Sequence, residues 1–323
     1  MALAADGTVV GSVSGGCIED DLIARFMRPK ADGGLPPEGQ SNALYFPDRP
    51  PELIKYGVTA DEAHRFGLPC GGTIELLVEY NPDSQALIAL VALIEKGRLV
   101  QRNVRLDDGD VQLTDGTGCT AIGIVGDEVV NVFGPQYRML IIGAGHLAEC
   151  LSTMAVFCGF DVVVCDPREE YRGSWAVPRV EISSAMPDDM VLAMKPDGRT
   201  CVVALTHDPK LDDLALMEAL KSDAFYVGAI GSRLNNQMRR ERLVEHFGHS
   251  LAEVGRLRGP VGVYIGSKTP PEIAVSIMAE ILACKNAIEL PSSLNISSSK
   301  AKQETMTDDQ RMLICGLGDS QYS

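Results

Sequence analysis

The chain has 323 residues, 45% of them hydrophobic, and a formal net charge of −15 at pH 7. Its length suits two domains with a hydrophobic core each, and its negative charge argues against broad binding to nucleic acid or to anionic membranes. No stretch approaches the roughly 18 consecutive apolar residues of a membrane span, and residues 1–10 lack the basic start of a signal peptide, so we expect a soluble, cytoplasmic protein without membrane contact.

The chain contains nine cysteines, and none of them has C-x-x-C spacing. A zinc ribbon or a disulfide framework is therefore not expected, and the sequence assigns no set of metal ligands. Most of the cysteines, such as Cys158, Cys165 and Cys201, lie in apolar runs and are expected to be inert core residues.

Cys17 follows a predicted strand at residues 8–13 and the turn Ser14-Gly15-Gly16. After it the apolar residues recur at helical spacing, and acidic residues, Glu19 among them, fall in the first turn, where the helix dipole favours them. Cys17 is therefore predicted to lie at or near the start of a helix. Such a position lowers the pKa of a thiol and favours a reactive thiolate.

A second cysteine of this kind lies in Gly67-Leu68-Pro69-Cys70-Gly71-Gly72, just before a predicted strand at residues 73–80. Cys17 follows a pair of glycines and Cys70 precedes one, so a ligand can approach either sulfur where the backbone is uncrowded. Two such cysteines in one domain indicate a functional thiol pair. The alternative for each is a small residue that fills a turn.

The rest of the N-terminal half predicts a helix followed by hairpins. Residues 83–96 have the spacing of an amphipathic helix, with Asn81-Pro82-Asp83 as its start signal. Residues 100–133 form short alternating runs separated by glycine turns, a pattern typical of antiparallel hairpins. Gly134-Pro135-Gln136-Tyr137 then breaks the pattern, so we place a smaller α+β domain over residues 1–134.

Residues 138–168 have the order strand, glycine turn, helix, strand. The apolar run at residues 139–142 ends in Gly143-Ala144-Gly145-His146-Leu147-Ala148, a G-x-G-x-x-A turn, and the helix that follows leads into a second apolar run at residues 162–165. In such a turn the first glycine permits the tight bend, the second leaves room for a phosphate, and the alanine lets the helix pack closely on the strand.

Asp166 closes the second apolar run, 23 residues after Gly143. This is near the spacing at which a carboxylate accepts a hydrogen bond from a ribose hydroxyl. Because the strand, the helix and the acidic residue agree, the stretch predicts a bound nucleotide-like ligand. The alternative is a turn of this type that has lost its ligand.

Beyond Asp166 strands and helices continue to alternate, as in a doubly wound parallel sheet. Two polar motifs, Thr206-His207-Asp208 and Gly228-Ala229-Ile230-Gly231-Ser232-Arg233, lie at the carboxyl ends of predicted strands, the edge on which open α/β sheets bind ligands. His207 and Asp208 are therefore candidate ligand contacts, with a structural histidine as the alternative. The predicted strands are residues 180–183, 200–205 and 224–230, and the predicted helices are residues 188–195, 212–221 and 234–247.

Residues 229–268 carry seven basic and three acidic residues, a local charge of +4 in an acidic chain. Either these arginines lie on a solvated helix face, or they form an anion site centred on Arg233 at a helix start. Thr269-Pro270-Pro271-Glu272 is a capping box that opens a helix to about Asn286, so we predict a Rossmann-like domain over residues 138–288. The serine-rich tail, residues 289–323, is expected to be weakly ordered.

Six motifs in this order resemble those of the xanthine dehydrogenase accessory factor family, XdhC/CoxI, over nearly all of residues 1–286. The pattern of that family usually starts some tens of residues earlier, and it often has an acidic residue where Tyr264 stands here, so the surroundings of Cys17 and any role of Tyr264 stay open. The motifs are Gly11-Ser12-Val13-Ser14-Gly15-Gly16-Cys17-Ile18-Glu19, Gly67-Leu68-Pro69-Cys70-Gly71-Gly72, Gly143-Ala144-Gly145-His146, Thr206-His207-Asp208, Gly228-Ala229-Ile230-Gly231-Ser232-Arg233 and Thr269-Pro270-Pro271-Glu272-Ile273-Ala274.

The resemblance implies a two-domain protein that binds the molybdenum cofactor, shields it, and helps its sulfuration or insertion into a xanthine dehydrogenase-like apo-enzyme. Such a protein is a chaperone rather than an enzyme, with a cysteine desulfurase and a second copy of the chain as further candidate partners. The alternative is an NAD(P)-dependent oxidoreductase that uses the dinucleotide turn. For that alternative the sequence supplies no clear pairing of Lys, Tyr or His for proton transfer.

The candidate site residues follow from the motifs and the resemblance together. Cys17, Glu19 and Cys70 are expected to face the metal and dithiolene end of a molybdopterin, with or without a nucleotide. The phosphate or nucleotide end is assigned to Gly143, Gly145, His146, Asp166, Arg168, His207, Asp208, Gly231, Ser232 and Arg233.

Overall fold

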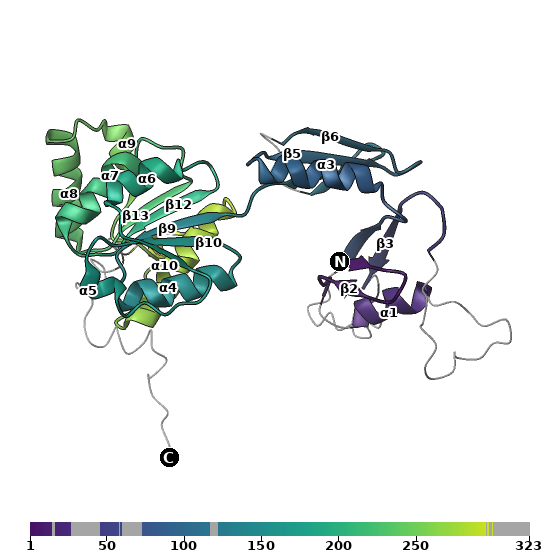
Figure 1. Cartoon of the computed structure of the whole chain (residues 1–323), viewed down its shortest axis with the longest axis horizontal. Helices are drawn as coiled ribbons and strands as arrows, with labels where there is room; N and C mark the ends of the chain where they lie inside the picture. The colour runs from purple at the N-terminus through teal and green to yellow at the C-terminus, as the bar shows by residue number, and fades with distance from the viewer. Residues whose placement is uncertain are drawn as a thin grey trace, which may run out of the picture. The chain divides into compact units, whose positions relative to one another are not determined.

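The computed structural model describes residues 1–14, 17–26, 46–57, 59, 73–116, 122–294, 296 and 299. The chain divides into two compact units, Met1–Pro135 and Gln136–Ser323, and the division falls within the stretch that breaks the hairpin pattern (Figure 1). Among these residues, no helix is long and apolar enough to cross a membrane. Cys70 with its glycine motif, and most of the tail for which weak order is expected, lie outside the described residues.

The C-terminal unit is built on a six-stranded parallel sheet. The strands are β9 (Arg138–Ile142), β10 (Asp161–Cys165), β11 (Glu181–Ser183), β12 (Thr200–Ala204), β13 (Tyr226–Ala229) and β14 (Leu257–Arg258). Their order across the sheet is β11-β10-β9-β12-β13-β14, so the first strand of the unit is central and the order reverses between β9 and β12. This is the strand order of a Rossmann fold, and it confirms the predicted doubly wound sheet.

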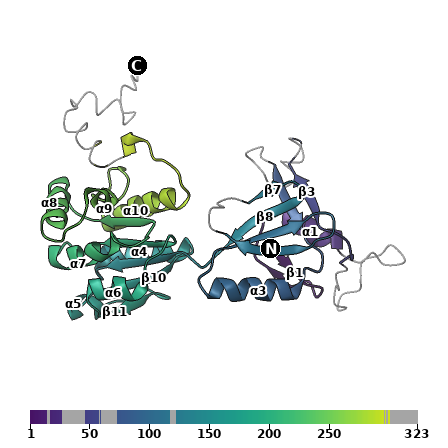
Figure 2. The same cartoon turned by 90° about the horizontal axis from the view of Figure 1, so that it is seen from above.

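Helices cover both faces of this sheet (Figures 1 and 2). They are α4 (His146–Phe157), α5 (Glu169–Arg172), α6 (Pro187–Met194), α7 (Pro209–Ala219), α8 (Arg233–Glu245), α9 (Leu251–Gly255) and α10 (Pro270–Lys285), followed by the 3-10 turn η1 (Ser292–Leu294). Met139 and Ile141 of β9 join a core with α4 and α10, whereas Leu140 and Ile142 join a second core with α6, α7 and α8. Because both faces are buried, the strands are continuous apolar runs.

α7 begins at Pro209, three residues before its predicted start. Asp208 is its N-cap, and the Asp208 side chain accepts a hydrogen bond from the Lys210 N–H at 2.9 Å. Proline in the first turn suits this start because its missing N–H would have no partner inside the helix. Asp208 therefore has a structural role as a helix cap, and its contact with a ligand stays a prediction.

The N-terminal unit combines two helices with antiparallel strands in the part of it that the structure describes. Its elements are β1 (Ala2–Leu3), β2 (Val9–Val10), α1 (Cys17–Phe26), β3 (Glu52–Tyr56), β4 (Ile74–Val78), α3 (Ser84–Glu95), β5 (Val100–Arg105), β6 (Val111–Asp115), β7 (Gly123–Val125) and β8 (Glu128–Phe133). β1 pairs with β2, β3 pairs with β4, and the remaining strands form a sheet of order β6-β5-β8-β7. α1 packs Ile18 and Leu22 against Ile54 and Tyr56 of β3.

Candidate functional site

The loops that follow β9 and β12 lie side by side at the point where the strand order reverses. These strands are neighbours in the sheet, and the helices that follow them, α4 and α7, pack into opposite cores. Ligands of open α/β sheets bind at such a point, beyond the carboxyl ends of the strands. The two loops are in close contact, because a Cβ on Gly143 would lie only 3.0 Å from Thr206 Cγ2, and the Gly143 φ of +106° also favours glycine.

Gly145 leaves open space at the start of α4. It is the N-cap residue, and no side chain caps the helix there. Within the described chain, no atom beyond its immediate neighbours lies within 4 Å of a Cβ placed on Gly145. The helix start therefore offers N–H groups and the positive end of its dipole to an anion. His146 is the exposed first residue of α4, and its Nδ1 lies 3.1 Å from Glu149 Oε2.

Asp166 is fully buried, and its carboxylate holds both the turn and Arg168. Asp166 Oδ2 accepts from the Ala144 N–H at 2.9 Å and from Arg168 Nη2 at 2.8 Å. Asp166 Oδ1 accepts from the Arg168 N–H at 3.0 Å and from Arg168 Nε at 2.9 Å. Burial raises the pKa of Asp166, but these hydrogen bonds outweigh burial and hold the pKa below its ordinary value.

These contacts bear on the predicted role of Asp166. A carboxylate accepts about four hydrogen bonds, and the turn and Arg168 together supply that number. A ribose hydroxyl therefore reaches Asp166 only if Arg168 moves, and the ribose contact stays a prediction. The Arg168 guanidinium is also held by the Tyr171 ring, with its carbon 3.9 Å from the ring centroid.

The loop after β12 is ordered by its own side chains. Thr206 Oγ1 donates to Asp212 Oδ1 at 2.7 Å and accepts from the Asp208 N–H at 2.9 Å. His207 lies between them, is exposed, and has a φ of +61°, a left-handed conformation that is uncommon outside glycine. Strained backbone of this kind persists where the surroundings hold it, and it clusters at ligand sites.

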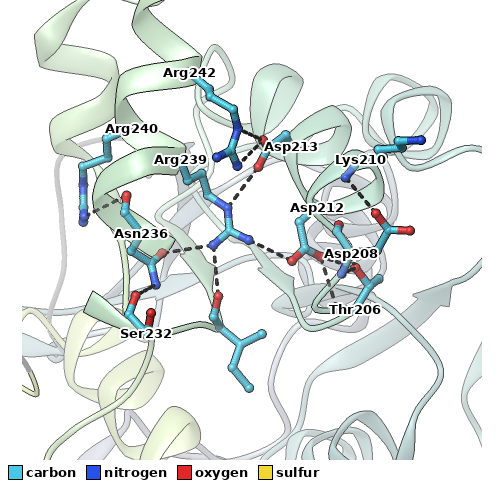
Figure 3. Close-up of polar contacts among 11 residues, drawn as sticks. Thr206, Asp208, Lys210, Asp212, Asp213, Ser232, Asn236, Arg239, Arg240 and Arg242 are labelled. Carbon is cyan, nitrogen blue, oxygen red and sulfur yellow. Dashed lines mark hydrogen bonds and ion pairs between the residues drawn. The ribbon is translucent and has the colours of Figure 1, made fainter. Parts of the chain in front are cut away.

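Arg239 of α8 is only 4% exposed and joins this loop to the loop after β13 (Figure 3). Arg239 Nη2 donates to Asp212 Oδ2 and Arg239 Nε donates to Asp213 Oδ1, each at 3.0 Å. Arg239 Nη1 donates to the carbonyl oxygen of Ile230 at 3.0 Å. Because Asp212 also accepts from Thr206, one buried guanidinium connects both loops of the predicted ligand edge.

The charges in this cluster are balanced. Arg242 donates from Nε and Nη2 to Asp213 Oδ2 at 2.9 and 2.7 Å, so two carboxylates face two guanidinium groups. Burial raises the pKa of Asp212, although hydrogen bonds from Thr206 and the charge of Arg239 act in the opposite direction. Thr206 and Arg239 therefore both favour the ionised form of Asp212 against the effect of burial.

The basic residues of the stretch 229–268 are largely used inside the fold. Arg239 and Arg242 bind the two aspartates, and Arg240 and Arg256 donate to main-chain carbonyl oxygens. Protein acceptors already take several N–H groups of each of these four arginines, which leaves fewer of them for an anion. Much of the positive charge in this stretch is therefore carried by arginines that bind aspartates or main-chain carbonyl oxygens within the fold.

Gly231, Ser232 and Arg233 form the start of α8. Gly231 has a φ of +132°, and the Oγ of Ser232, the N-cap residue, accepts from the Asn235 N–H at 3.1 Å. Arg233 is the exposed first residue of the helix. Arg239 donates a hydrogen bond to Ile230 in the same loop and another to Asp212, which in turn binds Thr206. One hydrogen-bond network therefore connects this motif with Thr206-His207-Asp208.

In the N-terminal unit, Cys17 is exposed and begins α1. Cys165 and Cys201 are buried instead: burial raises the pKa of Cys165 to about 12 and also raises the pKa of Cys201. These two cysteines are core residues, as predicted, whereas Cys158 is only half-buried. Cys70 lies outside the described residues, so the pairing of Cys17 with Cys70 stays a prediction.

Glu19 organises the chain in front of α1. Glu19 Oε1 accepts hydrogen bonds from the Ser12 hydroxyl at 2.6 Å and from the N–H groups of Val13 and Ser14 at 2.7 and 2.9 Å. The predicted strand to Val13 ends at Val10, because residues 12–14 form hydrogen bonds with Glu19 at the start of α1 instead of continuing the strand. A role of Glu19 toward a metal stays a prediction.

Comparison with protein-family models identifies the family of the chain. Residues 139–281 match the XdhC Rossmann domain, and residues 1–34 match the XdhC and CoxI family. The chain belongs to the XdhC and CoxI family. The matched Rossmann domain includes the loops after β9, β10, β12 and β13, and hence the whole predicted ligand edge of this XdhC/CoxI protein.

Three proteins are similar to this XdhC/CoxI protein over most of its length. Uncharacterized protein YqeB of Escherichia coli (strain K12) is 24% identical over 99% of this chain, which spans only 45% of the length of YqeB. Molybdenum cofactor insertion chaperone PaoD of the same strain is 27% identical, over 92% of this chain and 81% of PaoD. A probable xanthine dehydrogenase subunit of Bacillus subtilis (strain 168) is 24% identical, over 87% of this chain and 86% of that protein.

A solved structure described as a xanthine dehydrogenase from Bacillus halodurans has a similar fold. It is 23% identical in sequence, with a TM-score of 0.62 over 90% of this chain and 87% of that one. At this identity the likeness shows the fold.

The sequence interpretation missed Asp212, Asp213 and Arg239. Two signals were present: adjacent aspartates at a helix start, and arginines one turn apart on a later helix of the XdhC/CoxI Rossmann domain. Which arginine meets which aspartate depends on how α7 and α8 pack, and sequence spacing does not give that.

Proposed function

We propose that this protein binds the molybdenum cofactor and helps to insert it into a xanthine dehydrogenase-like molybdoenzyme. The observation that carries the proposal is the open, uncapped start of α4 at Gly145, next to the loop after β12. The names of PaoD and of the Bacillus subtilis relative support the same cofactor and the same class of partner. A cytoplasmic location, sulfuration of the cofactor with a cysteine desulfurase as sulfur donor, and a homodimer are further parts of the proposal.

The two ends of the cofactor need different protein groups. An anionic phosphate suits helix N-terminal N–H groups, and the space beside Gly145 fits such a group. The metal and its sulfur ligands suit soft thiolates, and the exposed Cys17 is a donor of that kind. We therefore assign the phosphate or nucleotide end to the Rossmann edge, and the metal end to Cys17, Glu19 and Cys70.

An NAD(P)-dependent oxidoreductase is the second candidate. Its main support is the G-x-G-x-x-A turn with an acidic residue after the next strand. The observed contacts favour it less, because Arg168 and the turn already use the Asp166 oxygens that would bind a ribose.

Ligand binding distinguishes these candidates. The purified protein is incubated with molybdopterin, with NADH and with NADPH, and the bound ligand is measured after gel filtration. We expect molybdopterin to co-elute and the nicotinamide cofactors to be left behind. Retention of NADH or NADPH without molybdopterin would contradict the proposal and favour the oxidoreductase.

Cys17→Ser tests the thiol. Because Cys17 is exposed, the change in the free energy of unfolding is expected to stay within about 0.5 kcal/mol. Activation of the partner apo-enzyme is expected to fall by at least about tenfold, since an alcohol is a poor ligand for a soft metal centre. Cys158→Ser, at a half-buried cysteine of the other unit, is the matched control. If wild type and Cys17→Ser activate the apo-enzyme equally, the Cys17 thiol does not bind the metal end of the cofactor.

A further inference from the structure

The helix α3 of the N-terminal unit has an exposed apolar side. One side of α3 packs on β5 and β6, and Leu90 is buried there (Figure 2). Ile88 and Val91 lie on the other side and are 61% and 52% exposed. No charged residue occurs in α3 before Glu95, its last residue. Because a surface helix normally carries charged and polar residues on its outer side, this side of α3 is suited to contact with another protein surface.

The exposed side is a stripe with spacings of four, three and four residues. Its members are Ser84, Ile88, Val91 and Glu95. This is the spacing of a coiled-coil seam, which keeps one side of a helix toward a partner helix. Leu87, which is 38% exposed, widens the apolar part of the stripe. With 12 residues α3 is about 18 Å long, so one partner helix of similar length covers the whole stripe.

The apolar centre of the stripe is complementary to itself. A two-fold axis between Ala89 and Leu90 relates α3 to a second, antiparallel copy of itself and brings Ile88 of each copy opposite Val91 of the other. The two apolar contacts are then identical, as an isologous interface requires. A pattern that is its own complement favours a second copy of this chain over a different protein.

The two ends of the stripe match in the same arrangement. Ser84 of one copy lies opposite Glu95 of the other, and a serine hydroxyl donates to a carboxylate. Lys96 follows Glu95, and Asp83 caps the start of α3. Antiparallel copies place Lys96 of one chain at the same end of the contact as Asp83 of the other, whereas parallel copies would place like charges together. The charges therefore favour antiparallel helices.

We infer that two copies of this chain associate through antiparallel α3 helices, with Ile88 of each copy packed against Val91 of the other. The inference gives a surface to the homodimer of the proposed function and rests on that part of the proposal alone. A contact limited to two helices of this length is smaller than the roughly 1,200–2,000 Å² that stable interfaces bury, so the dimer is expected to be weak. Because each copy carries a net charge of −15, added salt should strengthen the association by screening repulsion.

Sedimentation velocity of the full chain over a range of micromolar concentrations tests the inference. Ile88→Lys and Val91→Glu each place an unpaired charge in both halves of the two-fold contact, so each should weaken self-association by at least about tenfold. Ala89→Lys, at an exposed position of α3 outside the stripe, is the matched control and should associate as wild type does. All three positions are exposed, so the fold should tolerate the changes, which thermal unfolding can verify.

An equimolar mixture of Ile88→Lys and Val91→Glu tests the pairing itself. In the antiparallel arrangement the introduced lysine of one copy faces the introduced glutamate of the other, and the second contact keeps the native pair of Val91 and Ile88. We expect the mixture to associate at least about tenfold more tightly than either variant alone. Parallel helices would give no such gain, because each introduced charge would then face an apolar side chain.

A chain that is monomeric at all these concentrations, an Ile88→Lys variant that associates as wild type does, or a mixture that gains nothing would overturn the inference. Association that salt weakens would also contradict it. If the chain is monomeric and Ile88→Lys loses activation of the apo-enzyme, the exposed side of α3 binds the partner enzyme instead.

The cofactor function is tested separately. If molybdopterin co-elutes with a chain that is monomeric or that dimerises elsewhere, the inference fails while cofactor binding stands. If the chain dimerises through α3 and retains no molybdopterin, the inference stands and the cofactor function fails.

Discussion

Arg239→Met is expected to lower the free energy of unfolding by about 3–5 kcal/mol, because it leaves the buried carboxylate of Asp212 without its cation. Asp212 is fully buried, and within the described chain Arg239 is the cation that forms an ion pair with it. Asp213 retains Arg242, so the loss falls mainly on Asp212. Urea unfolding of wild type and variant at pH 7 measures the difference.

The pH dependence of this loss has a definite sign. Without Arg239, burial raises the pKa of Asp212 further above its unfolded value of about 3.9. A group whose folded pKa is raised stabilises the fold at low pH and loses that contribution as pH rises through the folded pKa. The gap between Arg239→Met and wild type should therefore be smaller at pH 5 than at pH 8.

Arg239→Lys is the matched control, since it keeps the charge and loses the planar fork. It should fall between wild type and Arg239→Met. A loss below about 1 kcal/mol for Arg239→Met, or a loss that is the same at both pH values, would show that the buried ion pair does not hold the two loops.

The Rossmann sheet could be predicted because its strands are buried on both faces and form apolar runs. β9, β10 and β12 appear in the sequence as such runs, each followed by glycine or polar residues. β14, Leu257–Arg258, escaped prediction because two residues carry no periodicity.

The sequence indicated which residues lie at the candidate site, but it did not indicate the hydrogen bonds that they form with one another. The spacing of Asp166 from Gly143 indicated a ligand contact, but spacing cannot show that Arg168 binds the same carboxylate. Asp208 illustrates a similar limit, because an acidic residue between a strand and a helix can cap the helix, bind a ligand, or do both.

The ion pairs of Arg239 and Arg242 with Asp212 and Asp213 could not be predicted from the sequence for another reason. Arg239 and Asp212 are 27 residues apart and lie on different helices. Charge counting detected an excess of arginines in this region but could not tell solvated side chains from buried ones. Only the packing of α8 against α7 separates those cases.

Gly145→Val is expected to abolish binding of the phosphate-bearing ligand, with a loss of affinity of at least about 100-fold, or about 2.7 kcal/mol. The side chain would fill the open space at the start of α4, where a phosphate must approach the backbone. The fold should tolerate the change, because Gly145 has a φ of −83° and a ψ of 176°, an extended conformation that valine adopts readily. The loss of stability should stay within about 1 kcal/mol, which thermal unfolding can measure.

Gly143→Ala is the informative companion to this variant. Its Cβ would meet Thr206 Cγ2 at 3.0 Å, and its φ of +106° is unfavourable for alanine, so stability rather than affinity alone should fall. The two substitutions in this turn are thus expected to have different effects, since Gly143 allows the contact between two loops and Gly145 is proposed to leave room for a ligand. Isothermal titration with molybdopterin separates them. If folded Gly145→Val binds as tightly as wild type, the phosphate does not lie at the start of α4, and the Rossmann edge loses its assigned role.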